Sequence, residues 1–228
     1  MDKRRFGGTH WGAGAERKVT SAKYWKEPFK WNKEAIATGT RPRVFCASLA
    51  DVFDVEAPKG KREDLYKLVK DTPNLDWLFL TKRIENAEEM LPKDWGDGYP
   101  NVWMGCTTED QKSADERIPI LGKIPAVVRW LSIEPQIEFI DFSKWMHEDP
   151  FFDWMVFGGE SGSSRPFDPD WVKPSLEVAG KNGISVFVKQ MGSVYAKANR
   201  YNSHKGDDID EWPNWVKVRE FPTARATA

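Results

Sequence analysis

The stretch DWMVFGGES, residues 153–161, has the pattern of a strand that is buried on both faces and then stops. An apolar run of this length, bounded by turn-forming residues, is typical of a parallel strand covered by helices. Two glycines follow the apolar residues, and a glutamate and a serine come next. Because glycines leave no Cβ at the strand end, a ligand can approach the backbone closely there. The stretch therefore predicts a buried strand with a binding site at its carboxyl end.

The same pattern occurs six times in the chain. Each time, an apolar, β-rich run is followed by a polar turn and then by a charged or amphipathic stretch. The six runs are RVFCASLAD (43–51), DWLFLTKR (76–83), NVWMGCTTE (101–109), AVVRWLSIEP (126–135), DWMVFGGES (153–161) and ISVFVKQMG (184–192). Their starts lie 33, 25, 25, 27 and 31 residues apart, which leaves room for one strand and one helix in each interval. Evenly spaced strands with polar ends favour an α/β fold with a parallel β/α barrel, partial or complete and TIM-like, over an open doubly wound sheet.

Most of the intervals between these runs have helical patterns. The segment 61–71 places its leucines and a valine at helical spacing beneath charged neighbours. The segment 107–121 begins with threonines and acidic residues that can cap a helix. The segment 168–183 starts at an aspartate cap, carries Pro174 in its first turn and ends at a glycine. The interval 136–152 is less regular, and we expect mainly loop there.

We expect a single domain with three parts: a basic, aromatic-rich and irregular N-terminal arm (1–42), a β/α core (43–192) and a loop-rich C-terminal extension (193–228). The extension is predicted to add one edge strand and to pack on the core. Residues 1–43 carry 11 Lys and Arg against 4 Asp and Glu, whereas the whole chain has a net charge of −1. Cations among flat rings are typical of nucleic-acid contacts. A solvated segment pinned to the domain by its aromatic residues would have the same composition.

Several classes of protein are disfavoured by the sequence. No apolar stretch approaches the roughly 18 residues that span a bilayer, and the charged N-terminus lacks the apolar core of a secretion signal. Cys46 and Cys106 are the only two cysteines, which indicates a cytoplasmic protein without a disulfide framework. The three histidines lack metal-ligand spacing, so no metal site is expected. A Walker-type phosphate loop and a nucleophile-elbow motif are also missing.

The carboxyl ends of the predicted strands form the candidate site, because ligands gather at that end of a parallel β/α architecture. The predicted ligand-binding residues are Ser48, Thr81, Arg83, Glu109, Ser132, Gly158, Gly159, Glu160, Ser161, Arg165, Lys189 and Gln190. The predicted catalytic residues are Glu134, Asp51 and Lys82. So many ionisable groups at one rim require partners or a ligand. Taken singly, each of them could instead cap a neighbouring charge or loop amide.

The charges of these residues predict a role in ligand binding for each of them. Successive free amides at the glycine-containing strand end, with nearby serine hydroxyls, would form an anion-binding concavity that Arg165 reinforces. Glu160 would hold a polar or cationic part of the ligand, and Glu134 or Asp51 would accept a proton or orient the ligand. The groups expected to hold an anionic part are Lys82, Arg83 and Lys189.

The quoted motifs resemble, in order and spacing, a phage and prophage family named after gp thirty-seven and gp sixty-eight. The matching motifs are VFCASLADVFD, LDWLFLTKR, NVWMGCTTEDQKSADERIPIL, RWLSIEP, DWMVFGGESGSSRPFDPDWV and FVKQMG, followed by the tail WPNWVKVREFP. The family supplies no settled activity. Its members open with three closely spaced cysteines, the last followed by Tyr-Ala. That segment and the barrel-like pattern resemble radical S-adenosylmethionine enzymes, in which three thiolates hold a [4Fe–4S] cluster.

This sequence departs from the resemblance at the cluster-binding segment. It begins at Met1, where the family is already past its third cysteine, and Cys46 and Cys106 lack the count and spacing to replace the triad. Either the segment is encoded upstream or lost, or this member keeps the barrel for binding alone. The Gly-Gly-Glu of radical enzymes also follows an early strand, whereas residues 158–160 follow a late one.

The resemblance implies a phage-related radical S-adenosylmethionine-like enzyme, or its cluster-less remnant, that acts on a nucleotide or nucleic acid in the host cytoplasm. S-adenosylmethionine and a [4Fe–4S] cluster are implied as cofactors only if the three-cysteine segment exists. One alternative is a non-catalytic protein that binds nucleic acid or a host factor through the rim or the arm. Another is a metal-free barrel enzyme that acts on a phosphorylated metabolite. No membrane partner is expected.

Overall fold

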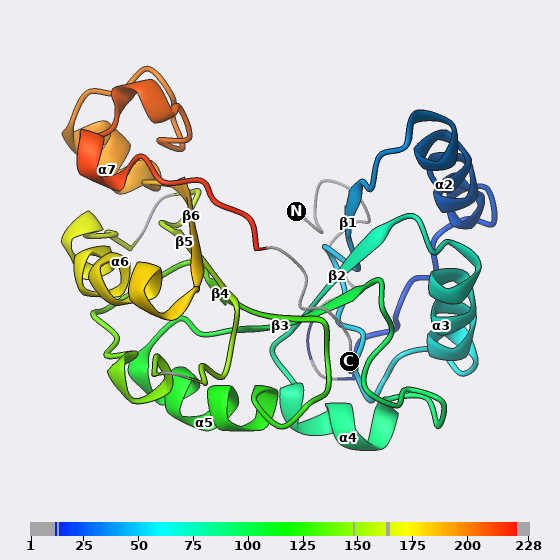
Figure 1. Ribbon diagram of the computed structural model, residues 1–228. Helices are drawn as coiled ribbons and strands as arrows, with labels where there is room; N and C mark the ends of the chain where they lie inside the picture. Colours follow the sequence, from blue (N-terminus) through cyan, green and yellow to red (C-terminus); the bar gives the residue numbers. More distant parts are fainter. Residues whose placement is uncertain (1–11, 13, 148, 163–164, 223–228) are drawn as a thin grey trace.

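The structure, a computed structural model, describes residues 12, 14–147, 149–162 and 165–222. Its centre is one six-stranded sheet in which every strand is parallel to its neighbours and the strand order follows the sequence. The strands are β1 (Arg43–Phe45), β2 (Asp76–Thr81), β3 (Val102–Thr107), β4 (Val128–Ile133), β5 (Trp154–Gly158) and β6 (Ser185–Gln190). They follow one another around an arc that stays open between β1 and β6 (Figure 1). The α/β fold is therefore a curled half-barrel, in keeping with the partial TIM-like barrel that the strand spacing predicts.

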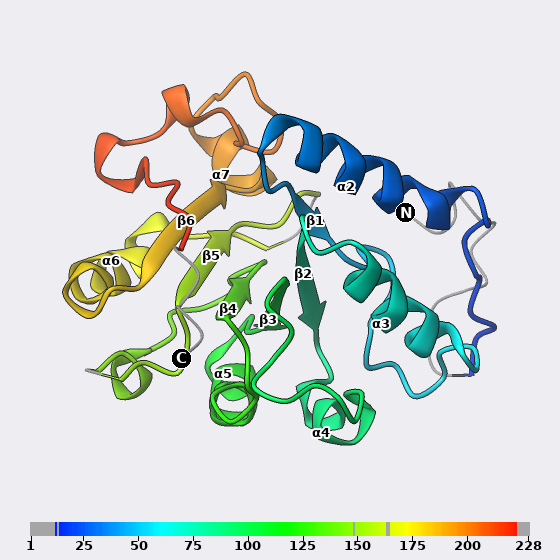
Figure 2. The ribbon, with the colours of Figure 1, turned by 45° about the vertical axis from the view of Figure 1, so that its right-hand side comes forward.

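Helices cover the outer, convex side of the arc, and two further helices flank its opening (Figures 1 and 2). The α-helices are α2 (Glu27–Thr38), α3 (Lys61–Asp71), α4 (Ala87–Met90), α5 (Gln111–Leu121), α6 (Lys173–Ala179) and α7 (Ser193–Ala198). The 3-10 turns are η1 (Tyr24–Lys26), η2 (Ile84–Asn86), η3 (Ser143–Trp145), η4 (Pro169–Val172), η5 (Gly180–Asn182), η6 (Ile209–Glu211) and η7 (Asn214–Val216). The main apolar core lies between these helices and the sheet and includes Phe79, Met104, Leu131 and Phe157. No helix in the described part of the chain has the length and apolar character of a membrane span.

The concave face of the sheet carries a second, smaller core, which we call the aromatic cluster: Trp103, Trp130, Trp154, Phe187 and Phe221. The ring centroids of Trp130 and Trp154 lie 5.4 Å apart, and those of Trp154 and Phe221 lie 5.3 Å apart. Gly105 on β3 makes room for this packing, because a Cβ there would lie 2.3 Å from the indole of Trp130. Phe221 comes from the C-terminal extension, so the tail of the chain completes the core of the arc.

The C-terminal extension covers the outer edge of β6. The amide of Val188 donates to the Val218 carbonyl at 2.8 Å, and the amide of Glu220 donates to the Val186 carbonyl at 2.9 Å. The pairing amounts to a single antiparallel bridge, Phe187 with Arg219. The edge strand that the sequence predicts is therefore reduced to this bridge, and loops and short helical turns make up most of the extension.

Three of the predicted helices are found where their patterns place them. The helix at 61–71 has the predicted bounds. The helix of the 107–121 segment begins only at Gln111, because Asp110, and not a threonine, accepts the Ser113 amide in a capping box. In the 168–183 segment, Asp168 caps η4 and Gly183 ends the last turn with a φ of 67°.

Two predictions about the N-terminal half need correction. The strand predicted in the run 43–51 was expected to include Cys46, but β1 is only three residues long and a turn begins at Cys46. The arm was expected to be irregular, yet it contains α2, a 12-residue helix with Pro28 and Ala35 buried. Residues 1–11 of the arm lie outside the described residues.

Candidate functional site

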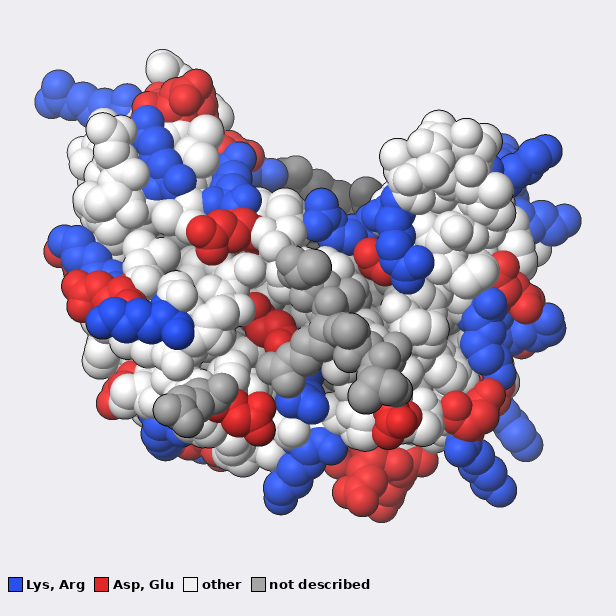
Figure 3. Space-filling view, in the orientation of Figure 1, with Lys and Arg blue, Asp and Glu red and all other residues white. Residues whose placement is uncertain are grey.

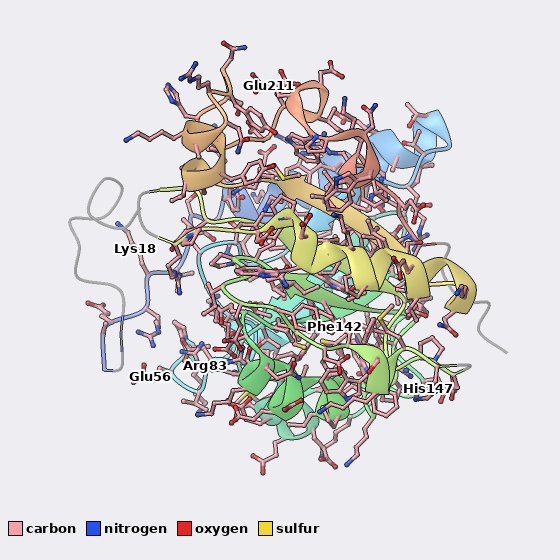
Figure 4. All side chains as sticks on the ribbon, turned by 90° about the vertical axis from the view of Figure 1, so that its left-hand side faces the viewer. Lys18, Glu56, Arg83, Phe142, His147 and Glu211 are labelled. Carbon is pink, nitrogen blue, oxygen red and sulfur yellow. The ribbon has the colours of Figure 1, made fainter. Side chains whose placement is uncertain are left out.

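The residues predicted for the site follow the strands at one end of the sheet. We call the charged members of this group the carboxyl-end cluster: Asp51, Lys82, Arg83, Glu109, Glu134, Glu160, Arg165 and Lys189. In Figure 4, Glu56 and Arg83, which follow β1 and β2, lie on one side of the molecule, and His147, which precedes β5, lies on the other. The parallel pairing of the strands explains this separation, since all their carboxyl ends point to the same side.

Asp51 fastens the loop after β1 to the end of β2. Its carboxylate accepts the Thr81 hydroxyl at 2.7 Å, the Lys82 amide at 3.0 Å and the Arg83 guanidinium at 3.3 Å. The Phe53 amide donates to the same carboxylate at 3.0 Å. A carboxylate with four donors has little capacity left for a proton or a ligand, so this geometry favours a structural role for Asp51 and Thr81.

Glu109 joins the ends of β2 and β3 to α5. Its carboxylate pairs with the ammonium group of Lys82 and lies 3.8 Å from the guanidinium of Arg117. Arg117 also donates to the Thr107 carbonyl at 2.7 Å. The sequence analysis did not identify Arg117, because it lies inside a helix and not at a strand end. Its i, i+8 spacing from Glu109 across the capped turn is the signal that relates the two residues.

Glu134 and Lys189 form the centre of the cluster. They come from the ends of β4 and β6, two strands that are not neighbours, and their charged atoms lie 3.2 Å apart across β5. The Glu134 side chain is only 18% exposed, whereas that of Lys189 is 58% exposed. Burial raises the pKa of Glu134 above its ordinary value, while Lys189 and a hydrogen bond from Ser132 oppose that rise. A shielded carboxylate with a raised pKa and an exposed cationic partner is suited to proton transfer.

The two glycines of the quoted stretch are needed for close packing. A Cβ at Gly158 would lie 2.9 Å from the Glu134 carboxylate, so this glycine lets Glu134 reach across β5 towards Lys189. A Cβ at Gly159 would lie 2.4 Å from the carbonyl oxygen of Met191. The Gly159 amide donates to the Gln190 carbonyl at 2.9 Å, and the Gln190 side chain donates back to the Gly159 carbonyl at 2.7 Å. The Gly159 amide is therefore engaged within the sheet and is not a donor for the expected anion.

Glu160 and Arg165 form a bidentate pair in the loop after β5. The guanidinium donates to the two carboxylate oxygens at 3.1 and 2.9 Å, and this contact raises the pKa of Arg165. Glu109 acts on Arg165 in the same direction, which links the loops after β3 and β5 electrostatically. The predicted reinforcement of an anion site by Arg165 thus competes with its pairing to Glu160 in this structure.

The remaining predicted residues are distributed less evenly. Ser132 is buried beside Glu134, and Gln190 bonds the loop after β5. Ser48 and Ser161 are exposed in their loops. Ser163 and Ser164, which were expected to supply further hydroxyls, lie outside the described residues. The structure thus brings together the eight charged residues of the carboxyl-end cluster along with Ser132, and it leaves Ser48 and Ser161 at the periphery.

The cysteines do not fit an iron–sulfur cluster. Cys46 follows β1 and Cys106 lies in β3, so β2 separates them, and both are buried. Burial raises the pKa of each thiol to about 12, which disfavours the thiolate that a cluster requires. Among the described residues no group of three or more His, Cys, Asp and Glu side chains is placed to hold a metal ion.

The described part of the N-terminal arm is attached to the domain by Arg17. Its guanidinium pairs with Asp54 at 2.9 Å and with Glu56, and it also donates to the Gly12 and Ala15 carbonyls at 2.9 and 2.7 Å. The arm is therefore held to the loop after β1 by an ion pair as well as by its aromatic residues. Two further cations of the arm are also paired, Lys30 with Glu27 at 2.9 Å and Arg41 with Asp76 at 2.6 Å.

Comparison with known proteins gives one match. A family model described as a protein of unknown function (DUF5131) matches residues 1–218. Searches of curated proteins and of solved structures return no match. The phage origin that the motifs imply stays a prediction. The chain belongs to the DUF5131 family.

Proposed function

We propose that this protein is a radical S-adenosylmethionine-like half-barrel enzyme, or a remnant of one without its own cluster, that binds a nucleotide or nucleic-acid ligand at the carboxyl-end cluster. Two general features support the proposal. The first is a sheet of six parallel strands in sequence order, whose carboxyl ends are where such folds place their ligands. The second is the concentration of paired charges at that end, since ion pairs between loops are readily exchanged for contacts with a charged ligand.

The observation that carries the proposal is the Glu134–Lys189 pair. Glu134 is shielded and has a raised pKa, so its carboxylate is a stronger base than an ordinary glutamate. Lys189 is mostly exposed, so it can turn towards a phosphate or carboxylate of a ligand. When Lys189 moves, Glu134 loses its main counter-charge and accepts a proton more readily. A ligand that carries both an anionic group and an acidic proton would therefore attract Lys189 through the anionic group. Glu134 would then act as the base that accepts the acidic proton.

The proposal assigns no reaction step to an iron–sulfur cluster, because the described residues do not fit one. If a three-cysteine segment supplied by a longer chain held a [4Fe–4S] cluster, the cluster would provide reductive radical chemistry. The part played by the residues described here would still be to bind and orient the ligand and to move a proton at Glu134.

The experiment is equilibrium binding of two probes, S-adenosylmethionine and a short single-stranded oligonucleotide, to the wild type and to four variants. Glu134→Gln and Lys189→Met change the pair. Glu177→Gln and Lys181→Met make the same chemical changes at exposed positions outside the cluster. We expect the first two variants to weaken binding of at least one probe about tenfold or more. The two control variants should bind like the wild type.

Two results would contradict the proposal. One is that neither probe binds the wild type at millimolar concentration. The other is that Glu134→Gln and Lys189→Met bind as well as their controls. Anaerobic reconstitution with iron and sulfide, followed by metal analysis, separates the two forms of the proposal. No cluster in this chain but a cluster in one extended upstream supports an enzyme, and no cluster in either supports a remnant.

The alternative function is nucleic-acid binding through the arm. Its exposed lysines Lys18, Lys23 and Lys26 favour it, whereas the pairing of Arg17 removes one cation. On the face seen in Figure 3, Lys and Arg side chains are interspersed with Asp and Glu instead of forming one patch. Removing the whole arm is not a useful test, because the packed helix α2 would be removed with it.

A charge-matched comparison tests the alternative directly. One triple variant changes the three arm lysines to Gln, and the other makes the same change at Lys123, Lys181 and Lys205, which are also exposed but lie outside the arm. Both lose three positive charges. If the arm binds single-stranded nucleic acid, only the first should reduce the salt dependence of binding, by a slope of about 2 for three lost phosphate contacts. If both triple variants reduce the salt dependence equally, general electrostatic attraction explains the binding and the arm has no specific part in it.

A further inference from the structure

The two outer edges of the sheet differ in what covers them. The extension bonds to β6 through Val188 and Val186, so that edge has partners. At the other edge, the Pro42 carbonyl and the Cys46 amide bond to β2. Because hydrogen bonding alternates along a strand, the amide and carbonyl groups of Arg43 and Phe45 point away from β2. No described residue forms a hydrogen bond with them, and Phe45 is 48% exposed.

A cavity lies directly beside this open edge. Its volume is about 570 Å³, within the range of ligand pockets. It lies between β1, α2, α3 and the loop after β1, elements that run side by side in Figures 1 and 2. The apolar residues that line it include Trp25, Trp31, Val44, Leu65, Leu68 and Trp77. An apolar cavity next to unpaired strand groups can receive side chains from a segment that pairs with the strand.

One polar atom in the wall of the cavity has no hydrogen-bond partner in the described part of the chain. The indole N–H of Trp25 is buried, and no described residue accepts its hydrogen bond. Buried donors are nearly always satisfied in folded proteins, so this N–H calls for water or for an acceptor other than the described residues. The ammonium group of Lys61 lies 5.7 Å from the centroid of the same ring, which places a cation at the rim of the cavity.

The charged residues that line the cavity have one predominant sign. Four are cationic, namely Lys18, Arg43, Lys61 and Arg62, and one is the carboxylate of Asp51. Lys61 pairs with Asp64 at 2.6 Å, and Arg62 donates to the Val52 and Asp54 carbonyls at 2.8 Å. The guanidinium of Arg43, in contrast, lies over the ring of Phe221, 3.5 Å from its centroid. Asp51 is already engaged by four donors of its own loop and of β2. The electrostatic complement of this surface is therefore an acidic segment.

We propose that the open edge of β1 and the adjacent cavity bind an extended peptide segment of a partner protein, which adds to the sheet as a seventh strand. The segment alternates apolar residues, which enter the cavity, with polar residues that include Asp or Glu and face Arg43. Its backbone pairs with the amide and carbonyl groups of Arg43 and Phe45. A carbonyl or carboxylate of the segment accepts the Trp25 N–H. The inference is independent of the function proposed for the carboxyl-end cluster.

A peptide fits these observations better than a small molecule or a second copy of the chain does. Two donors and two acceptors on alternate residues repeat with the spacing of a strand, which a compact ligand does not match. In a symmetric pairing of two β1 edges, Arg43 and its neighbouring cations would approach their own copies, and like charges oppose such an interface.

The test uses a synthetic seven-residue probe, acetyl-Asp-Val-Thr-Phe-Asp-Val-Thr-amide, and binding is measured by fluorescence anisotropy of a labelled form. Two further probes carry N-methyl groups, one on the odd-numbered and one on the even-numbered residues. In a β-ladder only alternate residues of the probe face β1. We therefore expect one methylated probe to bind at least tenfold more weakly and the other to bind within about twofold of the parent. These probes leave the protein unchanged, so no result depends on the folding of a variant.

Protein variants locate the site. Ala50→Trp places a bulky side chain in the lining of the cavity and should weaken binding about tenfold, whereas Ala198→Trp on α7 should not. Arg43→Glu should weaken binding of the acidic probe and strengthen binding of a probe that has Lys in place of Asp. Hydrogen exchange of the wild-type protein should show new protection of the Arg43 and Phe45 amides when the probe is bound.

Three outcomes would overturn the inference. The first is that the parent probe does not bind. The second is that both methylated probes lose affinity equally, which would mean association without strand pairing. The third is that sedimentation shows a dimer whose formation protects the Arg43 and Phe45 amides, which would make a second copy the occupant.

Discussion

The two ends of the same parallel strands contain different chemistry. Towards the amino ends, the concave face holds the aromatic cluster, with the three tryptophans at most 4% exposed. At the carboxyl ends lies the carboxyl-end cluster, where charges from non-adjacent strands pair and Glu134 keeps a raised pKa. The first set contributes buried apolar area, which stabilises the fold. Burying the charges of the second set requires their desolvation, and their ion pairs add little to the free energy of unfolding. This pattern is expected of residues that serve binding.

The largest expected effect comes from the aromatic cluster. Trp130→Ala removes a buried indole that contacts Trp154 and Phe45, and should lower the free energy of unfolding by about 4 kcal/mol. Gly105→Ala should also destabilise the protein, because its Cβ would overlap the same indole. Urea unfolding measures both changes. If the overlap is the cause, Gly105→Ala should cost much less when Trp130 is already Leu, and additive effects would contradict the packing described here.

A second prediction separates the two glycines after β5. Gly159→Ala meets the backbone of Met191, which cannot move aside, and should cost about 3 kcal/mol of stability. Gly158→Ala meets only the carboxylate end of Glu134, so it should cost clearly less and instead disturb the pairing with Lys189. We expect ligand affinity to fall in Gly158→Ala at a nearly unchanged melting temperature. Equal destabilisation by the two alanines would mean that both glycines serve only the fold.

A third prediction concerns pH and Glu134. Because the folded-state pKa is raised, the folded protein binds this proton more tightly than the unfolded chain does. The resulting stability is fully present below the ordinary pKa of 4.5 and is lost as the pH rises through the raised value. Relative to Glu134→Gln, the wild type should therefore lose stability as the pH is increased from 4 towards neutrality. Urea unfolding of both proteins over that range checks the sign, and an opposite slope would mean that Lys189 outweighs burial.

The smallest expected effect is the change in the free energy of unfolding when an exposed lysine of the carboxyl-end cluster is replaced. Lys82→Met and Lys189→Met remove side chains that are 53% and 58% exposed, so each should change the free energy of unfolding by no more than about 1 kcal/mol. Thermal melts at low and moderate salt measure this. A loss of stability as large as that of Trp130→Ala would mean that the two ends of the strands contribute equally to the stability of the fold.

The sequence predicts the outline of this fold because its strongest signals are local. The helix at 61–71 follows from its amphipathic spacing, and the parallel sheet follows from evenly spaced apolar runs. The length of β1 could not be predicted, because Cys46 and the residues after it turn away to form the loop that Asp51 fastens. The helix in the arm was missed because its aromatic residues were interpreted either as nucleic-acid contacts or as anchors of a solvated segment, and not as the packed face of a helix.

The site was predictable in part for the same reason. Strand ends can be read from the sequence, and so the charged residues that gather at one end were identified. Pairing between strands cannot be read in this way: the contact of Glu134 with Lys189 depends on the curvature of the sheet and on Gly158 between them. Arg117 was missed because it becomes a neighbour of the site only through tertiary packing. The aromatic cluster was missed because its residues, which come from separate strands and from the C-terminal extension, meet only in the folded sheet.

The central claim, that the carboxyl ends bind a ligand while the aromatic cluster stabilises the fold, is tested most directly by an NMR titration of the wild type with S-adenosylmethionine or the oligonucleotide. The account predicts shifts in the amides that follow β2 to β6, around Lys82, Glu109, Glu134, Glu160 and Lys189, with the indole signals of Trp103, Trp130 and Trp154 nearly unchanged. Saturable shifts that centre on those indoles, with the carboxyl-end amides unmoved, would contradict it.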